Sequence, residues 1–200
     1  MISDPSPPGP SRAERHPEAV LQEREAPSGP IPEAGKIGRI VDRFGVVFAL
    51  GIVGAMGVLI FEIVMRYGFG RPTLWAHETS IFLSAAAFIF GGLYAVSHDK
   101  HIRIVLLYDN LSPAGRRVLD VLISGVSLIA TLFFAYAAWT MVARSLWTPG
   151  GDFRLEGTGS AWNPPTPSIL KAFLFFILVV MAVQFLVLAI NYARGRRPDV

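Results

Sequence analysis

The side chains that could take part in catalysis or bind a metal are few and widely spaced in this sequence. Its four histidines are His16, His77, His98 and His101, and it has no cysteine. Transition metals need several His, Cys, Asp or Glu ligands that converge on one point. No helical face brings two carboxylates and a histidine together at such a spacing, and a glycine-rich phosphate loop and a nucleophile elbow are absent. The sequence therefore predicts no metal site, no cofactor and no catalytic residue.

Four polar side chains stand out because they interrupt apolar sequence. Glu62 and Arg66 are four residues apart, which places them on one helical face where they can form an ion pair. Glu78 stands at the start of the next apolar run, where the N-terminal end of a helix favours a carboxylate. Gln184 lies deep in the last apolar run and needs a hydrogen-bond partner, for which a neighbouring helix is the simplest source.

Four long apolar runs carry these side chains. The chain is 52% hydrophobic and only 16% charged, whereas about a quarter of the residues of a soluble domain are charged. Helices of about 20–25 residues cross a hydrocarbon core of about 30 Å, and the runs have this length. The sequence predicts an all-α membrane protein with four transmembrane helices, at 44–65, 76–97, 118–142 and 169–191. Ser112 and Pro113 have the character of an N-cap and a first helical residue, so the third helix is expected to begin before its apolar run.

The first 35 residues have a different composition. They contain eight of the fifteen prolines and too few apolar side chains to offset the entropy lost on ordering. No apolar stretch follows Met1, so the segment does not have the pattern of a signal peptide. We expect a disordered tail at 1–35, followed by a four-helix transmembrane domain at 36–197.

The distribution of basic residues predicts the orientation. Thirteen of the 18 Lys and Arg residues lie before the first run, between the second and third, or after the fourth. By the positive-inside rule, both termini are then cytoplasmic. The tryptophans lie near the opposite ends of the runs, as an interfacial belt requires; they are Trp75, Trp139, Trp147 and Trp162. The net charge of +3 forms no dense patch, so we expect contacts with membrane lipids and none with nucleic acid.

Small residues recur at helical spacing in the first two runs. They are Gly51, Gly54 and Gly57 in the first, and Ala87, Gly91 and Ala95 in the second. Such residues allow two helices in lipid to approach closely. We favour packing within the chain as their role, and a groove for another subunit is the alternative.

Five short motifs surround the second run in a fixed order: Arg66-Tyr67, Gly70-Arg71-Pro72, Trp75 with Glu78, His101-Ile102-Arg103, and Leu111-Ser112-Pro113. This ordered set, together with Gln184 in the last run, resembles the small membrane subunit of tripartite ATP-independent periplasmic (TRAP) transporters, the DctQ-like family. The motifs cover about half of the chain. Two positions depart from the family pattern: His77 replaces the first residue of a frequent Glu-Glu pair, and Val105 replaces an acidic residue.

The resemblance implies a small permease subunit, not an enzyme, in the bacterial inner membrane. In this family the subunit scaffolds a large sodium-coupled transport subunit, which imports an organic acid or a similar solute delivered by a periplasmic binding protein. Arg66, Arg71, Trp75 and Glu78 would form an outer cluster, and His101 and Arg103 would anchor the inner connection. The candidates for structural or partner-contact roles are Glu62, Arg66, Arg71, Trp75, Glu78, His101, Arg103 and Gln184.

Two other functions stay open at this point. A small membrane enzyme, quinone-linked or lipid-modifying, could use His98, Asp99 and His101 at the inner face. A self-contained small-solute carrier would have to form an oligomer, because the sequence has neither the internal repeats nor the interrupted helices that such carriers show at mid-membrane.

Overall fold

Four helices account for most of the chain. The computed structural model describes residues 30, 34–98, 112–148 and 150–194. Its elements are α2 (Gly35–Ile63), which continues as the π-helical turn η2 (Val64–Gly68), α3 (Leu74–Ser97), α5 (Pro113–Leu146) and α6 (Thr166–Ala193). All four helices are long and apolar enough to cross a membrane, and each contains one of the four apolar runs. The predicted all-α class with four membrane-spanning helices is confirmed. Most of the expected tail at 1–35 lies outside the described residues.

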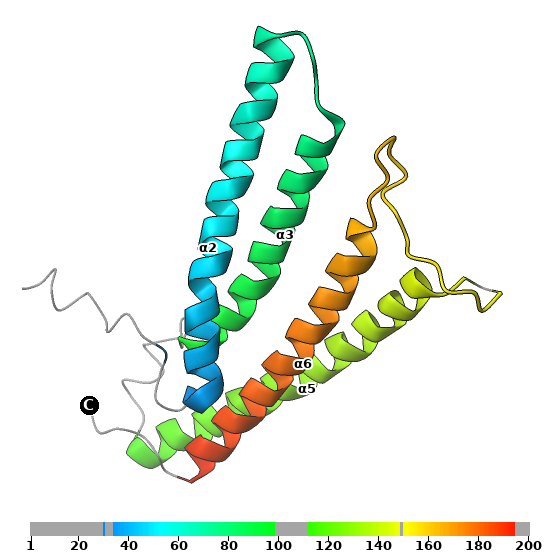
Figure 1. Cartoon of the computed structure of the whole chain (residues 1–200). Coiled ribbons are helices and arrows are strands. Elements are labelled where there is room, and N and C mark those ends of the chain that lie inside the picture. Colours follow the sequence, from blue (N-terminus) through cyan, green and yellow to red (C-terminus); the bar gives the residue numbers. More distant parts are fainter. Residues whose placement is uncertain (1–29, 31–33, 99–111, 149, 195–200) are drawn as a thin grey trace, which may run out of the picture.

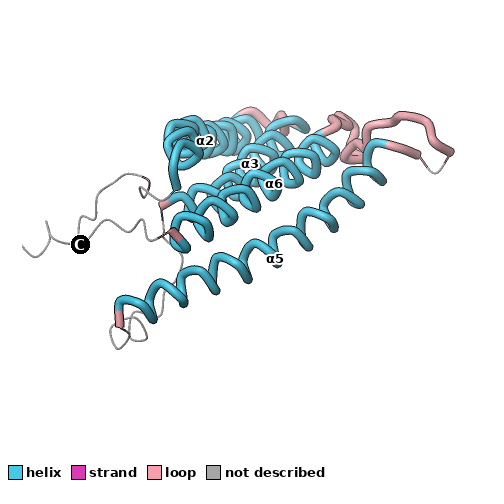
Figure 2. The backbone as a smooth tube through the Cα atoms, turned by 90° about the horizontal axis from the view of Figure 1, so that it is seen from below, coloured by secondary structure: helices cyan, strands magenta, loops and turns pink. Residues whose placement is uncertain are grey.

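The helices form two hairpins, α2–α3 and α5–α6, which meet through α3 and α6. Figure 1 shows the two connections within the hairpins, 69–73 and 147–165, at the same end of the molecule, which we call the loop end. The start of α2 and the end of α6 lie at the other end, the terminal end. Seen from below in Figure 2, α3 and α6 lie between α2 and α5, so the helices make an open row instead of a closed bundle.

A regular register joins α2 to α3. Asp42 is bonded to His98, and a Cβ at Gly45 would lie 2.7 Å from the ring of Tyr94. One turn further on, Phe48 stacks on Phe90 with 4.1 Å between ring centroids. The residue numbers rise along α2 while those of their partners fall along α3, as they must in an antiparallel pair. At Gly45 only a residue without a side chain leaves room for the Tyr94 ring.

Two apolar clusters connect the hairpins. The first contains Val41, Phe90, Leu93 and Ile177, and the second contains Val96, Phe185, Leu188 and Tyr192. Other large apolar side chains are exposed; Phe88, for instance, has 85% of its surface accessible. Such exposure fits a lipid environment, where apolar surface gains little by leaving the hydrocarbon for another helix.

The α5–α6 hairpin is joined at both ends. At the terminal end Arg117 of α5 donates through Nε to the carbonyl oxygen of Tyr192 at 2.9 Å and through Nη2 to that of Ala193, the last residues of α6. At the loop end the hydroxyl groups of Ser145 and Ser168 are 2.9 Å apart and buried. The serine contact satisfies two buried hydroxyl groups, and the Arg117 contact satisfies carbonyl groups at the C-terminal end of α6.

The expected start of the third helix is confirmed. The Ser112 hydroxyl oxygen accepts a hydrogen bond from the amide of Gly115, and Pro113 is the first residue of α5. At 34 residues, α5 is about 51 Å long. A helix of this length must tilt or project from a hydrocarbon core of about 30 Å, and Figure 1 shows it running obliquely to α2.

The preference for packing within the chain is wrong for three of the six small residues on which it was based. A Cβ placed at Gly51, Gly57 or Gly91 would have no atom of the chain within 4 Å, apart from its own local backbone. At Gly54 it would only reach Leu83, at 4.0 Å. Gly57 and Gly91 are exposed, whereas Gly51 lines a hollow of about 290 Å³ between α2, α3 and α6.

Replacing Gly45 by Val should weaken the α2–α3 hairpin, because the new side chain must displace the Tyr94 ring. Overpacking of this kind costs about 1–3 kcal/mol. We expect a lower thermal midpoint for the purified chain in detergent, and no comparable loss for Gly51→Val, where the space is open. Equal midpoints for the two variants would contradict the assignment of Gly45 to the hairpin contact.

Candidate functional site

The strongest group of polar contacts at the loop end is centred on Glu62. This residue is near the end of α2 and only 6% exposed. Its Oε1 accepts hydrogen bonds from Arg66 Nε at 3.1 Å and Nη2 at 2.6 Å. The pair therefore forms as its four-residue spacing predicts, and the half-exposed guanidinium covers the carboxylate on the solvent side.

The second oxygen of Glu62 connects α2 to α3. Oε2 accepts a hydrogen bond from the Thr73 amide at 2.9 Å and another from the Thr73 hydroxyl group. Thr73 is the N-cap of α3, and its own side chain makes no cap bond to that helix. The carboxylate thus lies at the positive end of the α3 dipole, where a negative charge is favoured. We call Glu62, Arg66 and Thr73 the Glu62 clip.

A tight turn brings Thr73 back to Glu62. The helix widens to the π-helical turn Val64–Gly68, and Gly70 then has a φ of +63°. The Arg71 amide donates to the carbonyl oxygen of Met65 at 2.9 Å and closes the helix end. Left-handed backbone favours glycine, and a residue before proline is held extended. The Gly-Arg-Pro motif therefore acts through its backbone, while the Arg71 side chain is exposed.

The expected outer cluster is divided among separate contacts. Arg66 belongs to the Glu62 clip, whereas the Trp75 ring lies 5.8 Å from that of Phe61. The carboxylate oxygens of Glu78 lie 3.2 and 3.3 Å from the Thr158 hydroxyl group. Glu78 therefore joins the first hairpin to the 147–165 connection of the second.

The 147–165 connection is held to its own hairpin by three residues. Lys171 of α6 makes an ion pair with Glu156, and the Ser168 hydroxyl lies 3.1 Å from the Glu156 carbonyl oxygen. The hydrogen bond from Lys171, followed by one from Ser145, lowers the pKa of the Glu156 carboxyl below its ordinary value. These contacts place Thr158 opposite Glu78.

Between the two connections lies a cleft of about 620 Å³. Trp75 and Trp162 line it from the two hairpins and are 42% and 47% exposed. Pro72, Leu74, Thr79 and Ala161 complete the lining. A cleft with two half-exposed tryptophans can receive an apolar or aromatic side chain of a partner protein.

A second polar contact joins the same hairpin at the terminal end. The side chain of His98 is 2% exposed, with Nδ1 3.0 Å from the Tyr94 carbonyl oxygen and Nε2 3.1 Å from Asp42 Oδ1. Both neighbours are acceptors, and the imidazole also stacks on the Tyr94 ring at 3.9 Å. His98 is thus enclosed by structural contacts. Asp99, His101 and Arg103 lie outside the described residues.

Gln184 is completely buried, and its partner is a backbone group. Nε2 lies 3.4 Å from the carbonyl oxygen of Ala34, the residue directly before α2. Oε1 has no hydrogen-bond partner in the described part of the chain. The amide therefore holds α6 against the start of α2. Among the described residues, no three His, Cys, Asp or Glu side chains are grouped as metal ligands.

Sequence reasoning missed several of these residues, among them Thr73, Asp42 and Thr158. Thr73 could have been found, because a threonine directly before an apolar run has the character of an N-cap. Asp42 is 56 residues from its partner His98, and Thr158 is 80 residues from its partner Glu78. No local sequence pattern indicates contacts over such separations.

Comparison with known proteins shows one family and several relatives that this chain resembles. The family described as tripartite ATP-independent periplasmic transporters, DctQ component, matches residues 55–195. The chain is 26% identical over 103 residues to the ectoine TRAP transporter small permease protein TeaB of Halomonas elongata. It is 28% identical over 106 residues to the C4-dicarboxylate TRAP transporter small permease protein DctQ of Vibrio cholerae. These alignments cover 51% and 52% of this chain, and 53% and 45% of the relatives.

Removing the carboxylate of the Glu62 clip should destabilise the α2–α3 hairpin. Glu62→Ala leaves the Arg66 guanidinium and the Thr73 amide without their acceptor, and unpaired polar groups at a helix junction are costly. We expect the thermal midpoint of the purified chain to fall by several degrees. Glu78→Ala, which removes longer and exposed contacts, should change it less. A larger effect of Glu78→Ala would show that Glu62 is not the main junction.

Proposed function

The chain belongs to the DctQ component family of TRAP transporters, and from this premise we propose that it scaffolds a large sodium-coupled transport subunit. That subunit would import an organic acid or a similar solute delivered by a periplasmic binding protein. The chain itself is a multi-pass protein of the inner membrane with four helices that can span it. The alignments span about half the length of the curated relatives, so activity, solute and partners are parts of the proposal.

One observation supports the scaffold role: three polar side chains, those of Glu62, His98 and Gln184, connect one helix to the next. Glu62 bonds to Arg66 and Thr73, and His98 lies between Tyr94 and Asp42. Gln184 contacts the start of α2. Polar groups in membrane helices often mark a transport path, but these are occupied by structural contacts.

We propose that the loop end faces the periplasm and the terminal end faces the cytoplasm. In the sequence, thirteen of the 18 Lys and Arg residues lie before the first apolar run, between the second and third, or after the fourth, and the positive-inside rule places these segments in the cytoplasm. In this orientation the cleft between Trp75 and Trp162 opens to the periplasm, where a binding protein would meet the membrane subunits.

The large subunit would dock on the small-residue face of the first hairpin. A groove of about 440 Å³ runs along α2 and α3 there, and four of its ten lining residues are small: Gly45, Ala49, Ala87 and Gly91. The others are Asp42, Val46, Phe48, Ile52, Phe90 and Tyr94. Gly91 has open space in front of it. Small residues let a second helix approach closely enough for van der Waals contact and Cα–H bonds. The groove therefore suits a transmembrane helix of the large subunit.

Orientation can be tested with single cysteines, because the chain has none of its own. Arg154→Cys lies in the loop-end connection and Arg194→Cys directly follows α6; both positions are exposed. A membrane-impermeant maleimide applied to cells with a permeable outer membrane should label Cys at 154 and reach 194 only after lysis. The reverse pattern would invert the proposed orientation.

Docking can be tested with two adjacent glycines of α3. Gly91→Leu fills the small-residue groove, whereas Gly92 is equally open but does not line it. With the large subunit co-expressed, Gly91→Leu should reduce co-purification and solute uptake in proteoliposomes about tenfold or more. Gly92→Leu should resemble the unchanged chain. Equal effects of the two variants would reject this face as the docking surface, and uptake without the chain would reject the scaffold role.

A further inference from the structure

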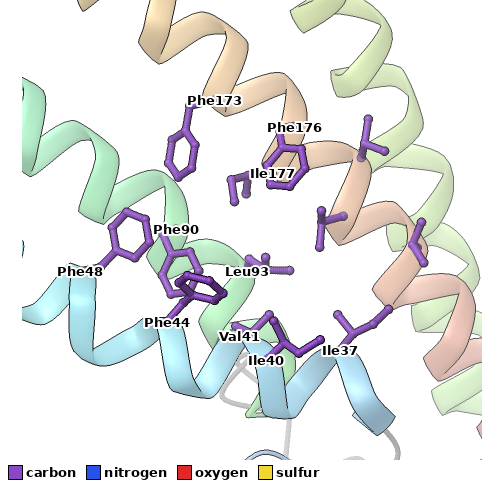
Figure 3. A pocket seen from close by; sticks show the side chains of 13 residues that line it. Ile37, Ile40, Val41, Phe44, Phe48, Phe90, Leu93, Phe173, Phe176 and Ile177 are labelled. Atoms are coloured by element: carbon purple, nitrogen blue, oxygen red, sulfur yellow. The ribbon is translucent and has the colours of Figure 1, made fainter.

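A second groove lies on the other side of the first hairpin, between α2 and α6. It has a volume of about 510 Å³ and is shown in Figure 3. Phe90 and Leu93 of α3 form its floor and are 6% and 2% exposed. Its walls are more open: Ile40 and Phe44 of α2 are 57% and 53% exposed, and Phe176 of α6 is 59% exposed. The groove is therefore a half-enclosed channel that opens sideways from the helices.

The lining of this groove differs in kind from that of the small-residue face. Every lining residue is Ile, Val, Leu or Phe, and none is Gly, Ala or Ser. Helices approach each other in membranes at small residues, and a helix with its side chains is about 10–12 Å wide. Bulky walls keep such a helix at a distance, whereas a thin hydrocarbon chain without backbone polar groups can lie between them.

The groove runs lengthwise along α2. Its lining on this helix extends from Ile37 to Phe48, which is twelve residues and about 16 Å of helix. At the end of the groove that is nearer the loop end, the Phe48 ring stacks between those of Phe90 and Phe173, with ring centroids 4.1 and 5.8 Å away. These rings separate the groove from a smaller hollow of about 290 Å³ that continues toward the loop end.

Two basic residues flank the open rim of the groove. Lys36 and Arg43 are four residues before and three residues after Ile40, which places all three on one stripe of α2. Both basic residues are exposed. Asp42, the neighbour of Arg43 in the chain, bonds to His98 of the α3 end. Basic side chains beside an apolar channel match the charge of a phosphate headgroup.

We propose that this groove binds one phospholipid of the bilayer, with an acyl chain along Phe90 and Leu93 and the phosphate near Lys36 and Arg43. The lipid completes the contact between the two hairpins where α2 and α6 diverge. It acts as a structural component of the subunit and exchanges more slowly than the surrounding lipid.

The test is native mass spectrometry of the full chain, purified in a mild detergent and supplied with palmitoyl-oleoyl phosphatidylglycerol. We expect one retained lipid. Val183→Trp adds an indole to the groove wall, where Val183 is 43% exposed, and should reduce retention about tenfold or more. The matched control Val126→Trp lies on α5 away from the groove, 66% exposed, and should retain the lipid. Equal retention by the two variants would overturn the proposal.

The headgroup contact has its own pair of variants. Lys36→Glu with Arg43→Glu should weaken retention about tenfold, while Arg144→Glu with Arg154→Glu, the same charge change at the loop end, should not. Equal effects of the two double variants would overturn the placement of the phosphate. The lipid assignment would also be overturned if organic extracts yielded a prenyl quinone instead, or if Val183→Trp kept the lipid but lost the large subunit.

Discussion

The contact on which the arrangement of the first hairpin depends is the hydrogen bonding of Glu62. In a bilayer, apolar helices gain little by leaving lipid for each other, so close packing and interhelical hydrogen bonds decide which helices stay together and in what register. Glu62 accepts hydrogen bonds both from the Arg66 guanidinium and from Thr73, the N-cap residue of α3. Because Thr73 donates its hydroxyl to Glu62 instead of capping α3, the end of one helix and the beginning of the next share a single acceptor.

The same principle repeats at the other helix ends. His98 and Asp42 close the first hairpin at the terminal end, and Arg117 closes the second by bonding to the last carbonyl groups of α6. Between the hairpins, by contrast, the described contacts are mainly the apolar clusters of α3 and α6. Each hairpin is thus joined at both ends, while the two hairpins are joined mostly along one line. Two polar contacts also join the hairpins, Glu78 with Thr158 and Gln184 with the carbonyl of Ala34, and the helices lie in an open row (Figure 2).

The sequence was sufficient to predict features set by local physics. Apolar run length predicted the four helices, Ser112 and Pro113 predicted the start of α5, and the four-residue spacing predicted the pairing of Glu62 with Arg66. Contacts between distant residues were not predictable. Asp42 and His98, or Gln184 and the carbonyl of Ala34, meet only after the helices are arranged. Packing of Gly51, Gly57 and Gly91 within the chain was wrongly predicted for the same reason. Their spacing identifies a face suited to close packing but does not identify the helix that covers it.

The arrangement leaves two unlike surfaces on either side of the α2–α3 contact, and their difference follows from side-chain size. On one side Gly91 and its small neighbours expose backbone that can lie against another backbone. On the other side Phe44 and Phe176 project from diverging helices and keep any backbone away. A helix loses little entropy when it fits the first surface, since it is already rigid, whereas a flexible acyl chain can adapt to the uneven walls of the second. The size of the side chains on α2 and α3 therefore separates the face for a protein partner from the face for lipid, and both faces exist because the four helices do not close into a bundle.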